Sequence, residues 1–131
     1  MDPRIADLRR RVARDGAASA EDIDEIDDML DAEGPSVELL ILRGQLIQLV
    51  GDGDDDALEE AFACYREALE LNPESALANE EIGHFLDDVA DDPIEAVPFF
   101  RKAIALGAGA SAEEGLRDVL SQLGGEDGEP V

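Results

Sequence analysis

The segment from Ala61 to Pro73 constrains the fold more than any other part of the chain. It reads Ala-Phe-Ala-Cys-Tyr-Arg-Glu-Ala-Leu-Glu-Leu-Asn-Pro. Its apolar residues recur at the spacing of one helical face, and Pro73 stands just past the end of the pattern. Ala61 and Ala68 are small enough to let another helix approach closely, and Tyr65 fills the space between them. The segment therefore predicts a helix that packs tightly against a neighbour.

The same helical period runs through the rest of the chain and is interrupted at regular intervals. No strand-like alternation occurs, so the pattern predicts an all-α fold of seven helices. Ser19 and Ser36 stand where helix caps are expected, an Asp ends the acidic turn 51–56, and Ser111 to Glu114 has the form of a capping box. Helix breakers separate the segments at Gly16, Gly34-Pro35, Gly51–Gly53, Pro73, Asp92-Pro93 and Gly107–Gly109.

These features resemble the tetratricopeptide repeat (TPR) family, whose pattern is W-x2-L-G-x2-Y, then A-x3-F, then P. The residues at the pattern's positions are Leu40, Arg43, Gly44 and Ile47 ahead of Ala61 and Tyr65, and Asn79, Ile82, Gly83, Leu86, Ala96 and Phe100 in the next repeat. Arg43 departs from the family's leucine. The resemblance implies an α-α superhelix of about three hairpins with a C-terminal capping helix, in one domain over residues 1–123. Its parts would be a degenerate hairpin at 3–35, hairpins at 36–73 and 75–107, a capping helix at 111–123 and a disordered acidic tail at 124–131.

The net charge of −24 excludes several classes of partner. Nucleic acid and anionic membranes would be repelled, and a lone arginine cluster at residues 9–14 is more typical of a solvated face or of a counter-charge to an acidic helix. Residues 1–14 carry a net charge of +3 and the remainder −27. Two interpretations of the acidity stay open: it attracts a basic partner, or it reflects adaptation to high salt. With no membrane-length apolar run and no apolar signal core, the expected location is cytoplasmic.

The residue inventory argues against an enzyme, a cofactor and a metal site. The chain has one histidine and one cysteine, and no Gly-rich phosphate loop. Cys64 excludes an intrachain disulfide and is expected to be a small buried hydrophobe. His84 among acids suggests a weak metal site, but a histidine on a solvated helix face is the more common reading. Asp52, Asp54 and Asp56 have calcium-loop spacing, yet the loop's glycine and bidentate acid are absent, which predicts no tight calcium site.

The TPR resemblance also implies where a partner would bind. In that family a concave groove is lined by the first helix of each hairpin. The matching faces lack the lysine, asparagine and arginine that grip a C-terminal carboxylate in one subclass. The predicted partner-binding residues are Gln45, Gln48, Glu80, His84, Asp87 and Asp88. The sequence thus predicts a non-enzymatic module that binds a basic protein or peptide, as an adaptor, chaperone or immunity-type inhibitor; the alternative is a structural scaffold subunit with weak self-association.

Overall fold

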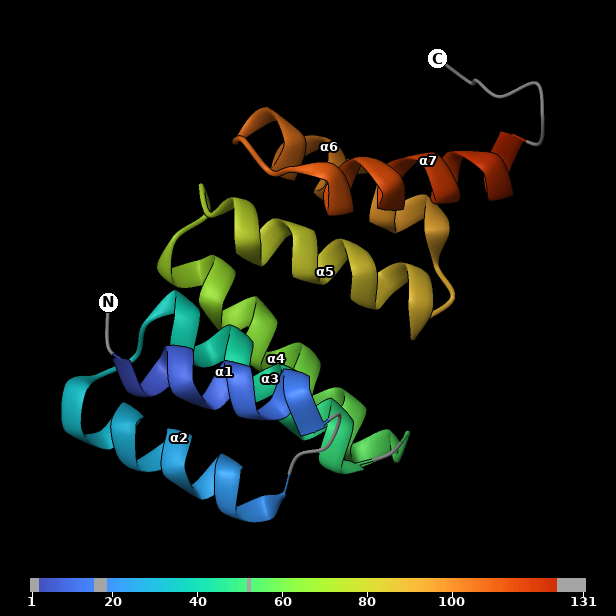
Figure 1. Cartoon of the computed structure of the whole chain (residues 1–131). Coiled ribbons are helices and arrows are strands. Elements are labelled where there is room, and N and C mark those ends of the chain that lie inside the picture. Colours follow the sequence, from blue (N-terminus) through green and yellow to red (C-terminus); the bar gives the residue numbers. More distant parts are fainter. Residues whose placement is uncertain (1–2, 16–18, 52, 125–131) are drawn as a thin grey trace. The chain divides into compact units, whose positions relative to one another are not determined.

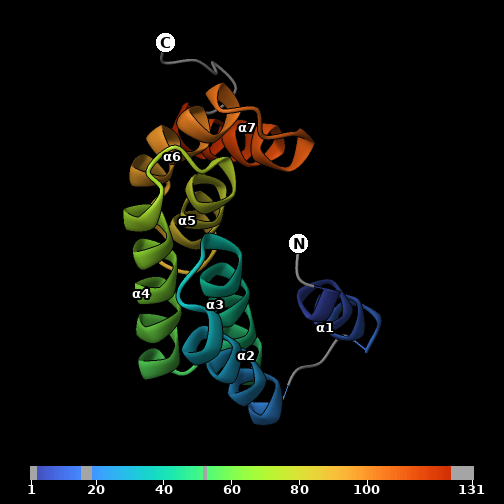
Figure 2. The ribbon, with the colours of Figure 1, turned by 90° about the vertical axis from the view of Figure 1, so that its left-hand side faces the viewer.

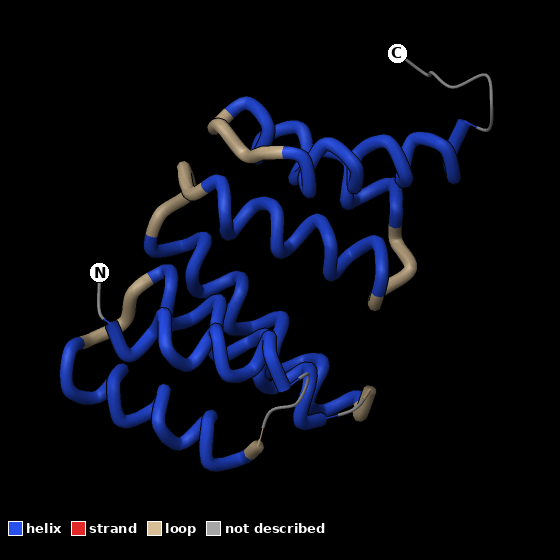
Figure 3. The backbone as a smooth tube through the Cα atoms, viewed as in Figure 1, coloured by secondary structure: helices blue, strands red, loops and turns tan. Residues whose placement is uncertain are grey.

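The computed structural model describes residues 3–15, 19–51 and 53–124, and every regular element in these ranges is an α-helix (Figures 1 and 3). The all-α prediction is therefore confirmed for the described chain. Within these ranges no helix is both long and apolar enough to cross a membrane. The helices are α1 (Pro3–Asp15), α2 (Ala20–Glu33), α3 (Val37–Gly51), α4 (Asp55–Leu71), α5 (Ala76–Asp88), α6 (Pro93–Ala105) and α7 (Ala110–Gly124).

Short-range capping explains where most of these helices begin. In four of them a side-chain oxygen accepts a hydrogen bond from the backbone N–H three residues further on, which satisfies a group that the helix itself leaves unpaired. The distances lie between 3.0 and 3.3 Å. These caps are Ser36, Asp54, Ser75 and Asp92. The predicted cap at Ser36 is confirmed. In the acidic turn an Asp does cap the helix, but it is Asp54, so α4 begins at Asp55, inside the predicted turn 51–56. Pro93, part of a predicted break, begins α6.

The predicted capping box at Ser111 is wrong. The helix begins one residue earlier, and the carbonyl of Gly109 accepts hydrogen bonds from the N–H groups of Ala112 and Glu113 at 3.1 and 3.3 Å. Ser111 therefore lies inside the first turn of α7, where its hydroxyl is released for a tertiary contact. A reciprocal hydrogen bond of the capping-box type occurs at the start of α2, where the N–H of Ser19 donates to the carboxylate of Asp22 at 3.0 Å.

The chain divides into two compact units, residues 1–71 and 72–131. In the first unit, α3 packs against α2 and α4, and Figure 2 shows α1 and α4 on opposite sides of α3. Such a central position requires apolar side chains on several faces of α3, and most of its apolar residues are buried. The C-terminal end of α3 is less buried, since Leu49 and Val50 are 50% and 38% exposed.

Two clusters of buried side chains hold the first unit together. On the α4 side, the ring of Tyr65 lies against Gly44, and Ala61 and Ala68 are fully buried. On the other side, α1, α2 and α3 share an apolar cluster. Its buried members are Ile5, Leu8, Ile26, Met29, Leu39, Leu42 and Leu46.

The second unit is built around Phe100 of α6. Its ring lies between two glycines, Gly83 of α5 and Gly115 of α7, whose missing Cβ atoms leave room for it. Ala96 and Ala103 flank it and are fully buried. The helices α5, α6 and α7 consequently all contact one another within this unit.

The predicted single domain over 1–123 and its internal boundaries stay predictions, because the two units are not placed relative to one another. Of the predicted tail 124–131, only Gly124 falls within the described residues. Asp52 of the acidic turn lies outside them as well. Asp54 of the same turn is used locally, since its carboxylate accepts from the N–H of Ala57 at 3.2 Å.

Candidate functional site

The predicted partner-binding residues fall into one group in each unit. Gln45 and Gln48 lie on α3 in the first unit, and the other four lie on α5 in the second. Gln48 accepts a hydrogen bond from the hydroxyl of Tyr65, so its side chain contributes to the packing of α3 on α4. Gln45 is half-buried on the same helix.

On α5, Glu80 and His84 are one helical turn apart and in contact. Nε2 of His84 lies 3.3 Å from a carboxylate oxygen of Glu80 and 3.2 Å from the hydroxyl of Ser111 on α7. The side chains of Glu80 and His84 are 19% and 30% exposed. The expectation of a fully solvated face is therefore wrong at these two positions, because α7 lies over part of it.

The approach of α7 depends on a small residue. A Cβ at Gly115 would lie 2.5 Å from the ring of Phe100 and 3.2 Å from Cε1 of His84. The His84 ring meets Phe100 edge-on, with centroids 4.9 Å apart and an interplanar angle of 75°. His84 is thus packed on one side and hydrogen-bonded on the other.

Ser111, His84 and Glu80 do not form a catalytic triad. In a triad the hydroxyl and the carboxylate bind different imidazole nitrogens, so that the base accepts a proton on one side and is oriented from the other. Here both groups face Nε2. The arrangement orients the His84 ring, but the ring cannot take a proton from Ser111 on one nitrogen while Glu80 binds the other.

Further along α5, three acidic side chains gather near its C-terminal end. Asp87 accepts a hydrogen bond from Nε2 of Gln122 on α7 at 2.8 Å. Partial burial raises the pKa of the Asp88 carboxyl, and the charges of Asp87 and of Asp118 on α7 act in the same direction. His84 acts against them. We call Asp87, Asp88 and Asp118 the α5–α7 acidic cluster; its members repel one another when ionised.

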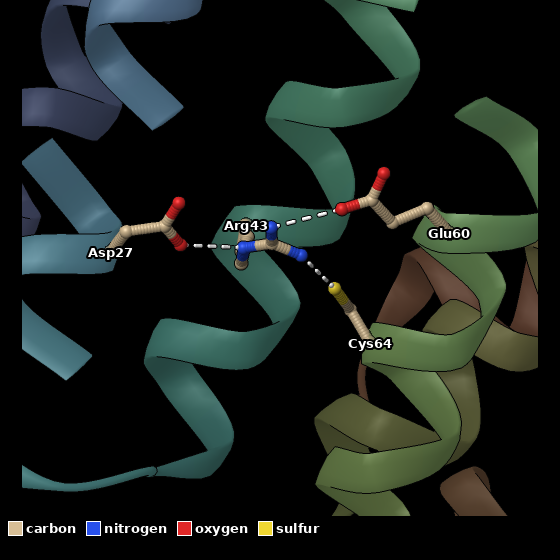
Figure 4. Close-up of polar contacts among 4 residues, drawn as sticks. All are labelled: Asp27, Arg43, Glu60 and Cys64. Carbon is tan, nitrogen blue, oxygen red and sulfur yellow. Dashed lines mark hydrogen bonds and ion pairs between the residues drawn. The ribbon is translucent and has the colours of Figure 1, made fainter. Parts of the chain in front are cut away.

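Arg43, which sequence reasoning treated only as a departure from a pattern, joins three helices (Figure 4). Its Nε donates to Asp27 of α2 at 2.7 Å, and its Nη2 donates to Glu60 of α4 at 2.9 Å. Its Nη1 lies 3.2 Å from Sγ of Cys64. Burial opposes the charge on the guanidinium, but these contacts outweigh it and the pKa of Arg43 is raised.

Cys64 is 5% exposed, which confirms the predicted buried position. Burial raises the pKa of its thiol, and Arg43 opposes that effect without reversing it. The thiol therefore stays protonated at neutral pH and is a poor nucleophile. Arg43 and its partners therefore join helices and form no reactive site. In the sequence, the one feature that could have predicted this contact is an arginine among the apolar residues of 37–50.

No group of three or more histidine, cysteine, aspartate or glutamate residues in the described ranges is arranged to hold a metal ion. No family model matches the chain. The search of curated proteins returned no relative.

Proposed function

We propose that the chain is a non-enzymatic protein-interaction module with TPR-like hairpins, which binds a basic protein or peptide. The repeat is supported by two sets of buried residues 35 positions apart, Ala61, Tyr65 and Ala68, then Ala96, Phe100 and Ala103. In each set the aromatic ring lies against a glycine of the preceding helix, Gly44 or Gly83. Equivalent packing at equivalent positions is what a repeated helical hairpin produces. In this scheme α7 is the capping helix.

The observation that carries the binding proposal is the α5–α7 acidic cluster. Partial burial raises the pKa of Asp88, and the nearby charges of Asp87 and Asp118 act in the same direction. Repulsion among them is relieved when lysine or arginine side chains of a partner approach, so the cluster favours a cationic ligand and steers its association. The partner-binding role of Glu80 and His84 in this scheme is to hold α7 beside the cluster through the contact with Ser111.

The alternative, a self-associating scaffold joined through the arginines of α1, has less support. Arg9 already contacts Glu38 of its own chain at 3.7 Å, and Arg10 contacts Asp7 within α1 at 3.5 Å. The cluster near Arg14, including Arg11, lies outside the described side chains. Sedimentation across a salt series separates the two functions, because a scaffold held by ion pairs would dissociate as salt rises.

The binding proposal is tested with an oligolysine peptide and the variant Asp88→Lys/Asp118→Lys. Both residues are exposed, whereas Glu80 and Asp87 have hydrogen bonds whose loss would disturb packing. The matched control is Glu67→Lys/Glu70→Lys, two exposed acids on α4. Fluorescence anisotropy should show binding weakened about fivefold or more in the first variant, and changed less than about twofold in the control. Equal weakening in both would assign the acidity to the whole surface and reject the cluster as the binding site.

A further inference from the structure

The helix α1 is opposite in charge to α2, one of the two helices it contacts. It carries five arginines and two aspartates, a net charge of +3. The helix that follows it, α2, carries five aspartates and three glutamates and no basic residue, a net charge of −8. A short basic helix thus lies against a strongly acidic one, while α3 has no net charge.

Two aliphatic side chains anchor α1. Ile5 and Leu8 are one helical turn apart and are 4% and 0% exposed. They pack on a surface that α2 and α3 form together, which we call the α2–α3 face. Its buried residues are Ile26 and Met29 of α2 and Leu39, Leu42 and Leu46 of α3. Burial of these two aliphatic side chains favours the docked helix, and the entropy lost in ordering the helix opposes it.

Ion pairs flank this apolar contact at both helices. Arg4 binds Glu33 at the end of α2, and Arg9 lies 3.7 Å from Glu38 at the start of α3. Arg10, by contrast, forms its ion pair within α1, with Asp7. The α2–α3 face therefore presents an apolar centre with a carboxylate on each helix, and α1 complements both features.

We propose that the α2–α3 face is a docking site for a basic amphipathic helix, and that α1 occupies it as an intramolecular competitor. The partner is defined by the chemistry of α1: two aliphatic residues one turn apart, flanked by arginine or lysine. Residues 16–18 join α1 to α2, so α1 competes at the high effective concentration of a tethered ligand. An external helix gains access in proportion to the fraction of chains in which α1 has left the face. This site is separate from the α5–α7 acidic cluster, and its existence does not depend on the binding function proposed there.

The probe is a synthetic peptide of residues 3–15 with blocked ends and a fluorophore. Its affinity is measured by fluorescence anisotropy for the parent chain and for two full-length variants that dislodge α1. Leu8→Glu removes the apolar anchor, and Arg4→Glu/Arg9→Glu turns both flanking contacts into repulsion while leaving Ile5 and Leu8 in place. Both variants should bind the peptide at least about tenfold more tightly than the parent, since the tethered competitor is weakened.

Three controls make the result specific. The variant Arg10→Glu should leave the peptide affinity within about twofold of the parent, because the side chain of Arg10 is exposed and pairs with Asp7 of its own helix. A peptide carrying Leu8→Glu should bind the parent and the dislodged chains with equal affinity. The gain in affinity caused by dislodging α1 should persist when Asp88→Lys/Asp118→Lys is added, which keeps this result apart from the test of the acidic cluster.

Circular dichroism of each variant tests whether α2 to α7 remain helical. Two dislodging variants are used so that the outcome does not depend on one protein that fails to fold. Equal peptide affinities in the parent and in whichever dislodged chain is folded would overturn the proposal. A parent chain that forms a concentration-dependent dimer, lost in Leu8→Glu, would overturn it too, since α1 would then bind a second copy.

Discussion

The ring of Tyr65 lies so close to Gly44 that a Cβ added to the glycine would be 2.5 Å from Cε1 of the ring. The substitution Gly44→Ala should therefore destabilise the first unit, although alanine normally stabilises a helix interior by about 0.5–1 kcal/mol relative to glycine. Overpacking costs about 1–3 kcal/mol, so the net loss should be about 1–2 kcal/mol. Urea unfolding followed by circular dichroism measures it. In a Tyr65→Leu background the penalty should shrink; a stabilising effect of Gly44→Ala would contradict the close contact.

The alanines Ala68 and Ala103 are fully buried at equivalent positions of α4 and α6. Replacing either with leucine should lower the free energy of unfolding by about 1–3 kcal/mol, because the neighbouring helix leaves no room for the larger side chain. The controls are Ala63→Leu and Ala105→Leu, at exposed positions of the same helices. Thermal melts that do not separate the buried pair from the exposed pair would show that the repeat register is misplaced.

The helices and their buried small residues could be predicted because the signals are local. Capping by Ser36, the stop at Pro73 and the spacing of Ala61 to Ala68 all act within a few residues along the chain. Each of these signals is therefore complete in the sequence itself. The structure confirms them as a cap, a helix end and a buried face.

The contacts around Arg43 and His84 could not be predicted because they depend on how helices are rotated against one another. Arg43 and Asp27 are 16 residues apart, and His84 and Ser111 are 27 apart. Gly115 was also missed as the position where α7 approaches α5 and α6. The predicted capping helix at 111–123 includes Leu123, yet this residue is 41% exposed. Small residues give no hydrophobic signal, although they decide which face can come close.

Replacement of Arg43 with methionine should destabilise the first unit. The methionine keeps the aliphatic stem but removes the hydrogen bonds to Asp27, Glu60 and Cys64. Because both carboxylates are about half exposed, the loss should be about 1 kcal/mol, at the lower end for charged hydrogen bonds. Arg101→Met, at an exposed position of α6, serves as the control. A double-mutant cycle with Asp27→Asn should show a coupling energy, and additive effects would mean that the pair contributes nothing.

The substitution Asp88→Asn should stabilise the fold at pH 7 and leave it unchanged at pH 3. Partial burial and the Asp87 and Asp118 charges raise the pKa of Asp88 above its ordinary value of 3.8. A carboxyl with a raised pKa binds its proton more tightly in the folded chain. Its contribution to stability is therefore complete below pH 3.8 and is lost as the pH rises through the folded-state pKa. At pH 7 the ionised group is a net cost that asparagine removes.

The expected rise in melting temperature at pH 7 is about 1–2 °C, as for a favourable change at a surface position in a chain of this size. Asp31→Asn is the matched control, since Asp31 is exposed near the C-terminal end of α2 as Asp88 is at the end of α5. Both substitutions remove a negative charge near the C-terminal end of a helix, where the helix dipole disfavours it. Each should therefore raise the melting temperature to some extent. Only Asp88→Asn also relieves the repulsion within the α5–α7 acidic cluster. Its gain should therefore exceed that of the control at pH 7, and equal gains would assign the whole effect to the dipole.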